Sequence, residues 1–402
     1  MPSSPESGGA PLDGVRVVDL SRVLAGPYAT MLLADLGADV VKVERPGEGD
    51  ETRSWGPPHA GGEAAYFLAV NRGKRSVAVD LKHPEGLALA LELSAAADVV
   101  IENFRPGAAA RLGLDAAAIH ARNSRVVYCS ITGFGRREPH DRPGYDFIVQ
   151  AESGLMAITG EPDAPPTKIG VALVDVLTGL NAAVAILAAL RRRDLGGTGE
   201  RIEISLLDSA LAALVNVAQN ALVMGEEPPR YGNAHASIVP YQPFAASDGW
   251  IAVAAANDSL FARLCEALAR PELATDKRFA TNAARVLHRD ALLPLLEETF
   301  ATRPADDWVA TLDAAGVPVG KIRGVLDALR TAAPATVRVN HPAAGELELV
   351  APPLSFESSA PPAPAPPPLL GQHTREVLAE LGVDDARLAA LEEAGVVATA
   401  ET

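Results

Sequence analysis

Short apolar runs alternate with helix-like segments through the first third of the chain. The apolar runs predict β-strands over residues 15–20, 40–44, 76–81, 98–103 and 125–131. Between them, apolar residues at helical spacing predict helices over residues 28–36 and 85–97. Strands separated by helices of this length form mostly parallel sheets. The pattern therefore predicts an α/β fold with a doubly wound sheet.

The rest of the chain divides where its composition changes. A long apolar helix is predicted over residues 176–193, and a strand and a further helix follow over 201–206 and 207–223. A polar segment with prolines at 225–232 then marks a boundary. We expect a large domain over residues 10–225, a small domain over 230–326, a proline-rich return linker over 327–368 and C-terminal helices over 369–397.

Charge and cysteine content limit the classes of partner. Of the 402 residues 48% are hydrophobic, and the formal net charge is −16 at pH 7. That charge disfavours nucleic acid and anionic membranes as partners, because both require a broad positive field. Cys129 and Cys265 have no metal-ligand spacing, so we expect no metal site and no disulfide framework, and a reducing cytoplasm fits.

The most apolar stretch, residues 171–190, is interrupted by Asp175, Thr178 and Asn181. These polar residues favour a buried helix with a polar entrance over a membrane span. The start of the chain is rich in proline, serine and glycine and has no apolar core, so we expect no signal peptide.

Asp175 allows two interpretations. It follows a strand-like apolar run, residues 169–174, at the predicted entry to a helix. The more common role of an aspartate there is to cap the helix, accepting a hydrogen bond from a free backbone N–H. The same donors would also hold a carboxylate in place for nucleophilic work. The spacing alone leaves both interpretations open.

Cationic residues recur near the predicted ends of strands, at Arg45, Arg72, Lys74, Arg75, Lys82, Arg105 and Arg111. Open α/β sheets bind ligands beyond the carboxyl ends of their strands. Guanidinium and ammonium groups suit phosphate, so we expect a phosphorylated ligand, with solvated surface charge as the alternative for any one residue. A dinucleotide is disfavoured, because the first turn, Leu24 to Ala29, has one glycine followed by proline where the fingerprint is G-x-G-x-x-G.

Several segments, in order, resemble the class III CoA-transferases, the family of formyl-CoA and carnitine CoA-transferases. The matching segments are residues 12–21 with Ala25-Gly26-Pro27, then 35–44, 49–58, 71–82, 102–107 and 130–135. The resemblance covers nearly the whole chain. It implies a Rossmann-like large domain built from both chain ends, a smaller inserted α+β domain and an interlocked homodimer.

The resemblance places Asp175 at the family's nucleophilic aspartate. Its carboxylate would attack a donor acyl-CoA, and an aspartyl-CoA thioester would follow by way of a mixed anhydride. CoA thioester is then a substrate, and no tightly bound cofactor is implied. Contacts to CoA are implied at Ala25, Arg45, Val79, Lys82, Asn103, Phe104, Arg105, Arg111 and Tyr145.

The resemblance also bears on the acyl group. Leu24 stands where formyl-CoA transferases have a substrate-contacting glutamine, which argues against formyl-CoA or oxalate. Trp55 and Tyr66 match positions near the acyl group.

The segment around His235 resembles family members that act on dicarboxylic acids with succinyl-CoA as donor. We therefore expect His235, helped by Arg53 or Arg22, to bind the distal carboxylate of the acceptor. The alternative for a lone histidine is a loop residue whose hydrogen bonds are already satisfied.

Two other functions compete with CoA transfer. An α-methylacyl-CoA racemase has the same fold, but its Gly-His-Asp segment reads Gly144-Tyr145-Asp146 here, and tyrosine is a poor base near neutral pH. A CoA-binding protein without turnover would be expected to lack the nucleophile, and Asp175 is present.

Overall fold

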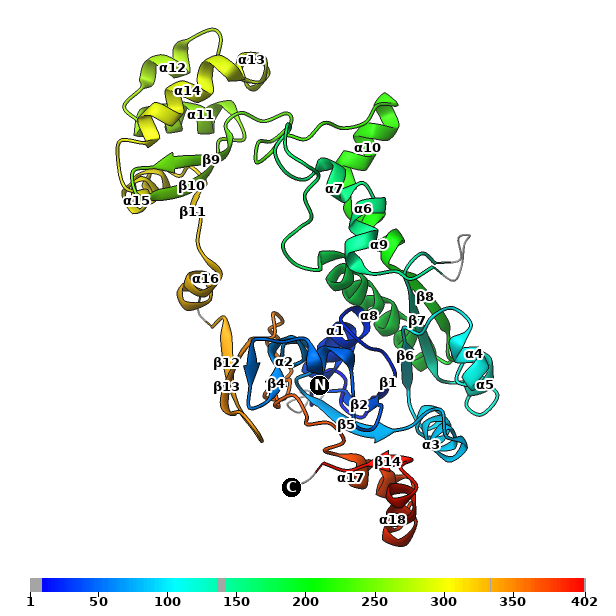
Figure 1. Cartoon of the computed structure of the whole chain (residues 1–402). Helices are drawn as coiled ribbons and strands as arrows, with labels where there is room; N and C mark the ends of the chain where they lie inside the picture. The colour runs from blue at the N-terminus through cyan, green and yellow to red at the C-terminus, as the bar shows by residue number, and fades with distance from the viewer. Residues whose placement is uncertain (1–8, 136–141, 333, 401–402) are drawn as a thin grey trace, which may run out of the picture. The chain divides into compact units, whose positions relative to one another are not determined.

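The computed structural model describes residues 9–135, 142–332 and 334–400 (Figure 1). The chain forms two compact units. Of these residues, the large unit comprises 9–135, 142–155, 169–219 and 334–400, and the small unit comprises 156–168 and 220–332. Each unit has a hydrophobic core and is described by itself.

A seven-stranded sheet organises the large unit, with the strand order β14-β5-β2-β1-β6-β7-β8. The strands are β1 (Arg16–Asp19), β2 (Asp39–Glu44), β5 (Lys74–Val79), β6 (Val99–Glu102), β7 (Val127–Thr132), β8 (Arg201–Ser205) and β14 (Val397–Ala398). All neighbours pair in parallel except β14, which is antiparallel to β5. In chain order the parallel strands read 3-2-1-4-5-6, the arrangement of doubly wound sheets. The α/β prediction is therefore confirmed.

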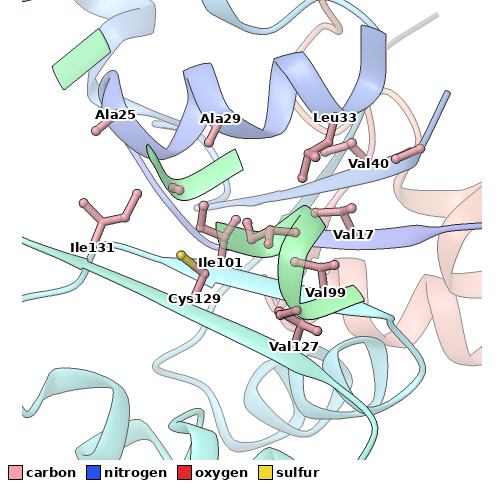
Figure 2. Packing of buried hydrophobic residues seen from close by; sticks show 14 of the residues in the cluster. Val17, Ala25, Ala29, Leu33, Val40, Val99, Ile101, Val127, Cys129 and Ile131 are labelled. Carbon is pink, nitrogen blue, oxygen red and sulfur yellow. The ribbon is translucent and has the colours of Figure 1, made fainter. Parts of the chain in front are cut away.

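Helices cover both faces of this sheet. On one face lie α1 (Ala25–Asp35) and α8 (Leu173–Asp194), and on the other lie α3 (Pro84–Ala95), α5 (Ala116–His120), α17 (Thr374–Glu380) and α18 (Asp385–Glu393). Figure 2 shows Ala29 and Leu33 of α1 packed over Val17 of β1. The next strand residue, Val18, belongs to the core on the opposite face. Burial on both faces explains why these strands read as continuous apolar runs.

Helix α8 begins at Leu173, earlier than predicted, and the strand expected over residues 169–174 is absent from this described segment. Short apolar runs do not distinguish a strand from a buried helix by periodicity, which explains the error. The helix is long and apolar enough to cross a membrane. In this structure, however, Val174, Ala182 and Ile186 pack in the core of the large unit.

The return segment over residues 327–368 is not wholly a linker. It contains the end of α16 (Val325–Thr331) and a hairpin of β12 (Thr336–His341) and β13 (Gly345–Val350). The hairpin has alternating polar and apolar residues with a glycine at its turn, a signal that the proline-rich composition obscured. After residue 350 the chain runs to α17 and α18, and β14 then joins the sheet beside β5.

The small unit has a three-stranded antiparallel sheet of β9 (Tyr241–Ala246), β10 (Gly249–Ala254) and β11 (Val319–Lys321). Its helices include α11 (Asp258–Ala267), α12 (Pro271–Thr275), α13 (Asn282–Leu287), α14 (Arg289–Phe300) and α15 (Ala305–Ala314). Phe300 contacts Phe244 and Trp308 in its core, with ring centroids 4.7 and 5.3 Å away.

The remaining elements are shorter, and most belong to the large unit. They are a 3₁₀ helix (Glu51–Ser54), β3 (His59–Ala60), β4 (Glu63–Ala64), α2 (Ala65–Val70), α4 (Ala108–Leu112), α6 (Asp146–Glu152), α7 (Leu155–Ile158), α9 (Leu206–Ala213) and α10 (Val215–Met224).

A buried charge network lies beneath the first strands of the large unit. Lys74 Nζ lies 3.1 Å from Asp19, and Lys42 Nζ lies 2.9 Å from Asp50, with all these side chains fully buried. Lys42 also donates to the Ser21 carbonyl at 2.8 Å. Burial by itself raises the pKa of Asp19, but Lys74, Lys42 and two hydroxyl donors outweigh it and lower the pKa to about 2. The network thus joins β1, β2 and β5 to the loop that precedes α1.

Replacing Asp19 with asparagine should destabilise the protein by about 3–5 kcal/mol, because Lys74 would then be a buried charge without its carboxylate. Urea unfolding would measure the loss. The double variant Asp19→Asn/Lys74→Met should regain part of it, since the unpaired ammonium is removed. A loss in Asp19→Asn of under about 1 kcal/mol, the size of an exposed pair, would contradict this account.

Candidate active site

The loops after β1 and β6 meet at the point where the strand order reverses. Asn103 joins them, because its Oδ1 accepts from the Arg22 backbone N–H at 2.9 Å and its Nδ2 donates to the Arg22 carbonyl at 2.7 Å. Ligands of doubly wound sheets bind in the crevice at such a reversal. Asn103 was expected to contact CoA, but the structure uses both polar atoms of its side chain to hold this loop.

The loop after β1 contains a strained residue. Val23 has φ +70°, a left-handed conformation that is unfavourable for a β-branched side chain. Its backbone N–H donates to both carboxylate oxygens of Asp50, at 3.3 and 3.2 Å. Since Asp50 is paired with Lys42, the buried network holds the loop that presents Leu24 and Ala25.

A cleft of about 190 Å³ opens beside this loop, and Asp175 lies in its lining. The residues predicted to bind substrate or CoA that also line it are Leu24, Ala25, Asn103, Phe104, Arg105 and Tyr145. We call it the nucleophile cleft. A larger cleft of about 820 Å³ beside α4 and α5 shares Phe104 and Arg105, but Asp175 does not line it.

Close packing of α8 against α1 brings Asp175 to the cleft. One turn after Asp175, a Cβ on Gly179 would lie only 2.7 Å from the carbonyl oxygen of Ala25. The two helices therefore approach closely because residue 179 is glycine. Asp175 in the first turn of α8 consequently lies beside the start of α1.

Asp175 is not the cap of its helix, so the capping interpretation was wrong. The residue before the helix is Ala172, and Asp175 is the third residue within it. The carboxylate that accepts from the first turn is that of Asp146, which bonds the backbone N–H groups of Val174 and Asp175 at 2.8 and 3.3 Å. Asp146 comes from α6, so sequence spacing around Asp175 could not reveal it.

Burial and a like charge raise the pKa of Asp175. Burial is the larger cause and the Asp146 carboxylate the second, and together they raise the pKa from 3.8 to about 7. The pKa of Tyr66 is raised to about 12. Burial is the largest cause, and the negative charges of Asp175, Asp146 and Asp50 follow. A carboxyl group with a strongly raised pKa in the lining of a cleft, as Asp175 is here, marks a candidate active site.

A second cleft, of about 390 Å³, is lined by both cationic and acidic side chains, and one of its cations, Arg45, is paired with Glu48. Arg45, Val79, Lys82 and Phe104, all predicted to contact CoA, lie in its lining. It shares Arg22, Glu51 and Phe104 with the nucleophile cleft, so the two adjoin. We call it the cationic cleft, after Arg45 and Lys82. Arg111 lies on α4 and is exposed, outside the lining of both clefts.

Arg53 was expected to help bind substrate, and in this structure its guanidinium is bound to two glutamates. Its Nε and Nη2 donate to Glu44 at 2.8 Å each, and its Nη1 donates to Glu63 at 2.9 Å. The guanidinium also lies 3.6 Å from the centre of the Phe67 ring. These contacts join Arg53 to Glu44 and Glu63, and its expected role toward substrate stays a prediction.

The other two predicted substrate residues of the large unit form a pair. Trp55 is 42% exposed, and its ring centre lies 5.1 Å from that of Tyr66 in an edge-to-face contact. Tyr66 also packs against the small cluster around Leu24, Met31 and Val70.

His235 belongs to the small unit. Its Nδ1 accepts from the Ser237 backbone N–H at 3.1 Å, and its ring centre lies 5.3 Å from that of Tyr241. Its expected role toward the acceptor stays a prediction. Among the described residues, no cluster of three or more His, Cys, Asp or Glu has an arrangement suited to a metal ion.

Comparison with known proteins gives a consistent result. A family model described as CoA-transferase family III matches residues 12–374. Succinyl-CoA:glutarate CoA-transferase of Mus musculus is 44% identical over 398 residues, which cover 98% of this chain and 91% of the mouse protein. Succinate–glutarate CoA-transferase of Agrobacterium fabrum is 44% identical over 382 residues, covering 92% of this chain and 96% of that protein.

A solved structure is similar as well. A CAIB/BAIF family protein from Brucella suis aligns with a TM-score of 0.84 at 44% identity, over 93% of this chain and 100% of that one.

The raised pKa of Asp175 predicts how its removal changes stability with pH. The Asp175 carboxyl has an ordinary pKa of 3.8 in the unfolded chain and a pKa of about 7 in the folded protein. As the pH rises through this range, the folded protein therefore becomes less stable. Asp175→Asn should therefore stabilise the protein, and the gain should grow by about 1–2 kcal/mol between roughly pH 4.5 and pH 8, allowing for solvent screening. Urea unfolding at both pH values measures it. A gain that is equal at both would contradict the raised pKa.

Proposed function

The chain belongs to CoA-transferase family III, and we propose that it moves CoA from succinyl-CoA to a dicarboxylic acid through a covalent intermediate on Asp175. The observation that carries the proposal is a partly buried carboxylate of raised pKa in a cleft that adjoins a second cleft with Arg45 and Lys82 in its lining. The relatives in mouse and Agrobacterium, whose names include succinyl-CoA or succinate and glutarate, support the choice of acids.

The reaction begins with the Asp175 carboxylate. One of its oxygens attacks the thioester carbonyl of the donor, a C–O bond forms, the C–S bond breaks, and CoA leaves as thiolate. The thiolate then attacks the aspartyl carbonyl, which forms an aspartyl-CoA thioester and releases the donor acid as a carboxylate. The acceptor carboxylate repeats these two steps in reverse order and leaves as acyl-CoA. Exclusion of water protects the anhydride and the thioester from hydrolysis.

We propose that different parts of CoA bind in the two clefts. Arg45 and Lys82 in the lining of the cationic cleft suit the phosphates, and Phe104, beside the buried Val79, offers apolar contact to adenine. Phe104 also lines the nucleophile cleft, so the pantetheine arm would pass it on the way to Asp175. Ala25, Asn103, Arg105 and Tyr145 then line the end of that path, and Arg111 adds positive charge from α4.

Arg22 is the residue best placed to bind the distal carboxylate of a dicarboxylic acid. It lines both clefts, and its partner Glu51 is about as exposed as Arg22 itself, at 46% against 47%. Exposed ion pairs are weak, so Arg22 can exchange Glu51 for a substrate carboxylate. Trp55 and Tyr66 are proposed to lie near the acyl chain, and His235 is proposed to help bind the acceptor acid.

The racemase alternative finds less support at the position of its base. Tyr145 is 58% exposed, and the next residue, Asp146, is engaged at the start of α8. A phenol is a weak base near neutral pH. Exchange of the α-proton of a 2-methylacyl-CoA in D₂O by the wild-type protein would favour the racemase.

We propose that the protein acts as an interlocked homodimer. Support comes from apolar side chains left exposed on the large unit, among them Phe147 on α6, Val184 on α8 and Leu211 on α9. Exposed apolar groups of this kind are typical of interfaces. A cytoplasmic location likewise stays a prediction.

Replacing Asp175 with alanine should abolish CoA transfer, because no other carboxylate is proposed to form the anhydride. Wild-type protein and the variant would be incubated with succinyl-CoA and a panel of mono- and dicarboxylates, with new acyl-CoA read by mass spectrometry. Wild-type protein should yield acyl-CoA of one or more dicarboxylates and show, on Asp175, a mass increase of one CoA less one water. Transfer by Asp175→Ala at the wild-type rate would refute the assignment.

Replacing Arg22 with glutamine should raise KM for a dicarboxylate acceptor about tenfold, the effect of losing one charge-assisted hydrogen bond. KM for a monocarboxylate of similar length should change little. Arg192→Gln is the matched control, since Arg192 is also exposed and paired with a glutamate, Glu200, but lies outside both clefts. An equal rise in KM for both classes of acid would contradict recognition of the distal carboxylate by Arg22.

A further inference from the structure

The Asp146 carboxylate is bound on three sides at the start of α8. Its Oδ1 accepts from the backbone N–H groups of Val174 and Asp175, at 2.8 and 3.3 Å. Its Oδ2 accepts from Nε2 of Gln150 at 2.6 Å. One oxygen of Asp146 therefore accepts hydrogen bonds from α8, the helix that contains Asp175, and the other accepts from α6, the helix that contains Asp146.

The first turn of α8 has no backbone donor left for Asp175. Leu173 N–H donates to the Val171 carbonyl at 2.8 Å, and Val176 N–H donates to the Ala172 carbonyl at 3.2 Å. The two N–H groups between them are bonded to Asp146. A carboxylate in the first turn normally gains stability from such donors. Within the described part of the chain, no hydrogen bond reaches the Asp175 carboxylate from its own helix.

We propose that Asp146 is a positioning residue that withholds the helix donors from Asp175 and thereby makes its carboxylate a stronger nucleophile. This rests on the proposed function, in which Asp175 is the nucleophile. A carboxylate without hydrogen-bond donors and beside a second negative charge is more basic than an ordinary one. Greater basicity increases nucleophilicity once the group is ionised.

The covalent step also relieves the repulsion between the two carboxylates. In the free enzyme, ionised Asp175 faces the negative charge of Asp146. When an Asp175 oxygen forms the C–O bond of the anhydride, and later when the aspartyl carbon forms the C–S bond to CoA, residue 175 is uncharged. The repulsion is therefore present before acylation and absent after it. Asp146 consequently favours the acylated enzyme over the free one.

The position of Asp146 is itself well determined. Gln150 is fully buried, and while its Nε2 bonds Asp146, its Oε1 accepts from the Ile169 backbone N–H at 2.9 Å. On the other side, a Cβ on Gly144 would lie 2.2 Å from Cα of Gly133, so the segment before Asp146 lies directly against the end of β7. These contacts fix Asp146 relative to both the sheet and α8.

Other charged and titratable groups share the surroundings of Asp175. Tyr66 of α2 interacts electrostatically with both Asp175 and Asp146. The cleft lining adds Arg22 and Glu51, which pair with each other, together with Arg105, Arg142 and Tyr145. Arg142 pairs with Glu152 on α6. Among these groups only Asp146 is hydrogen-bonded to the backbone of Asp175.

The test compares Asp146→Asn with the wild-type protein. Asparagine keeps an oxygen that can accept from Val174 and Asp175 but removes the charge. The acid limb of kcat/KM for succinyl-CoA should move down by about one pH unit in the variant, because a neighbouring like charge is gone. At equilibrium with succinyl-CoA, a smaller fraction of the variant should carry covalent CoA, as measured by intact-protein mass spectrometry. Asp384→Asn is the control, because Asp384 also caps a helix, α18, and lies outside both clefts.

A merely structural role for Asp146 would lower the melting temperature and leave the acid limb where it is, and that result would overturn the inference. If Asp146→Asn does not fold, Asp146→Ser is the second variant, because its hydroxyl oxygen can still accept a backbone hydrogen bond and it carries no charge. The acid limb should again move down, and an acid limb that stays at its wild-type position overturns the inference. The proposed function fails separately, through absence of acyl transfer by the wild-type protein with every acid tested.

Discussion

The ion pair between Lys42 and Asp50 supports most of what the site requires. Both side chains are fully buried, and each also holds a backbone group of the loop after β1: Lys42 the Ser21 carbonyl and Asp50 the Val23 N–H. Left-handed Val23 is unfavourable by itself and persists because this charged pair determines it. A buried pair of this kind adds little net stability, since desolvation offsets the attraction. The effect of this ion pair is to hold the loop before α1 in one conformation.

The nucleophile depends on that loop and on a second constraint. Gly179 lets α8 lie against the carbonyl of Ala25, so the first turn of α8 and the first residue of α1 line one cleft. Asp146 then takes the free N–H groups of α8. As a result, the Asp175 carboxylate lies at the positive end of α8 but accepts no hydrogen bond from the backbone of that helix. Such an arrangement is unfavourable for the free enzyme and suits a group whose charge disappears on acylation.

Much of the fold was predictable, and the errors have identifiable causes. The parallel sheet followed from apolar runs such as residues 40–44, because strands buried on both faces read as continuous hydrophobic segments. The start of α8 was misplaced, since a short apolar run does not show whether it is strand or helix. The hairpin of β12 and β13 was overlooked within a proline-rich region. In the site, Asp175 was identified through family resemblance, whereas the ion pairs of Arg53 with Glu44 and Glu63 could not be known from spacing.

The amino-acid sequence by itself determined the class of fold, the family and the residue that is proposed to react. These follow from periodicity and from motifs, which are properties of neighbouring positions along the chain. The surroundings of Asp175 were decided only by the tertiary structure. Asp146 lies 29 positions before Asp175, and its hydrogen bond to the backbone of that residue exists because α6 packs at the start of α8. Electrostatic effects depend on distance and burial in space, and neither is encoded in the local pattern that a sequence displays.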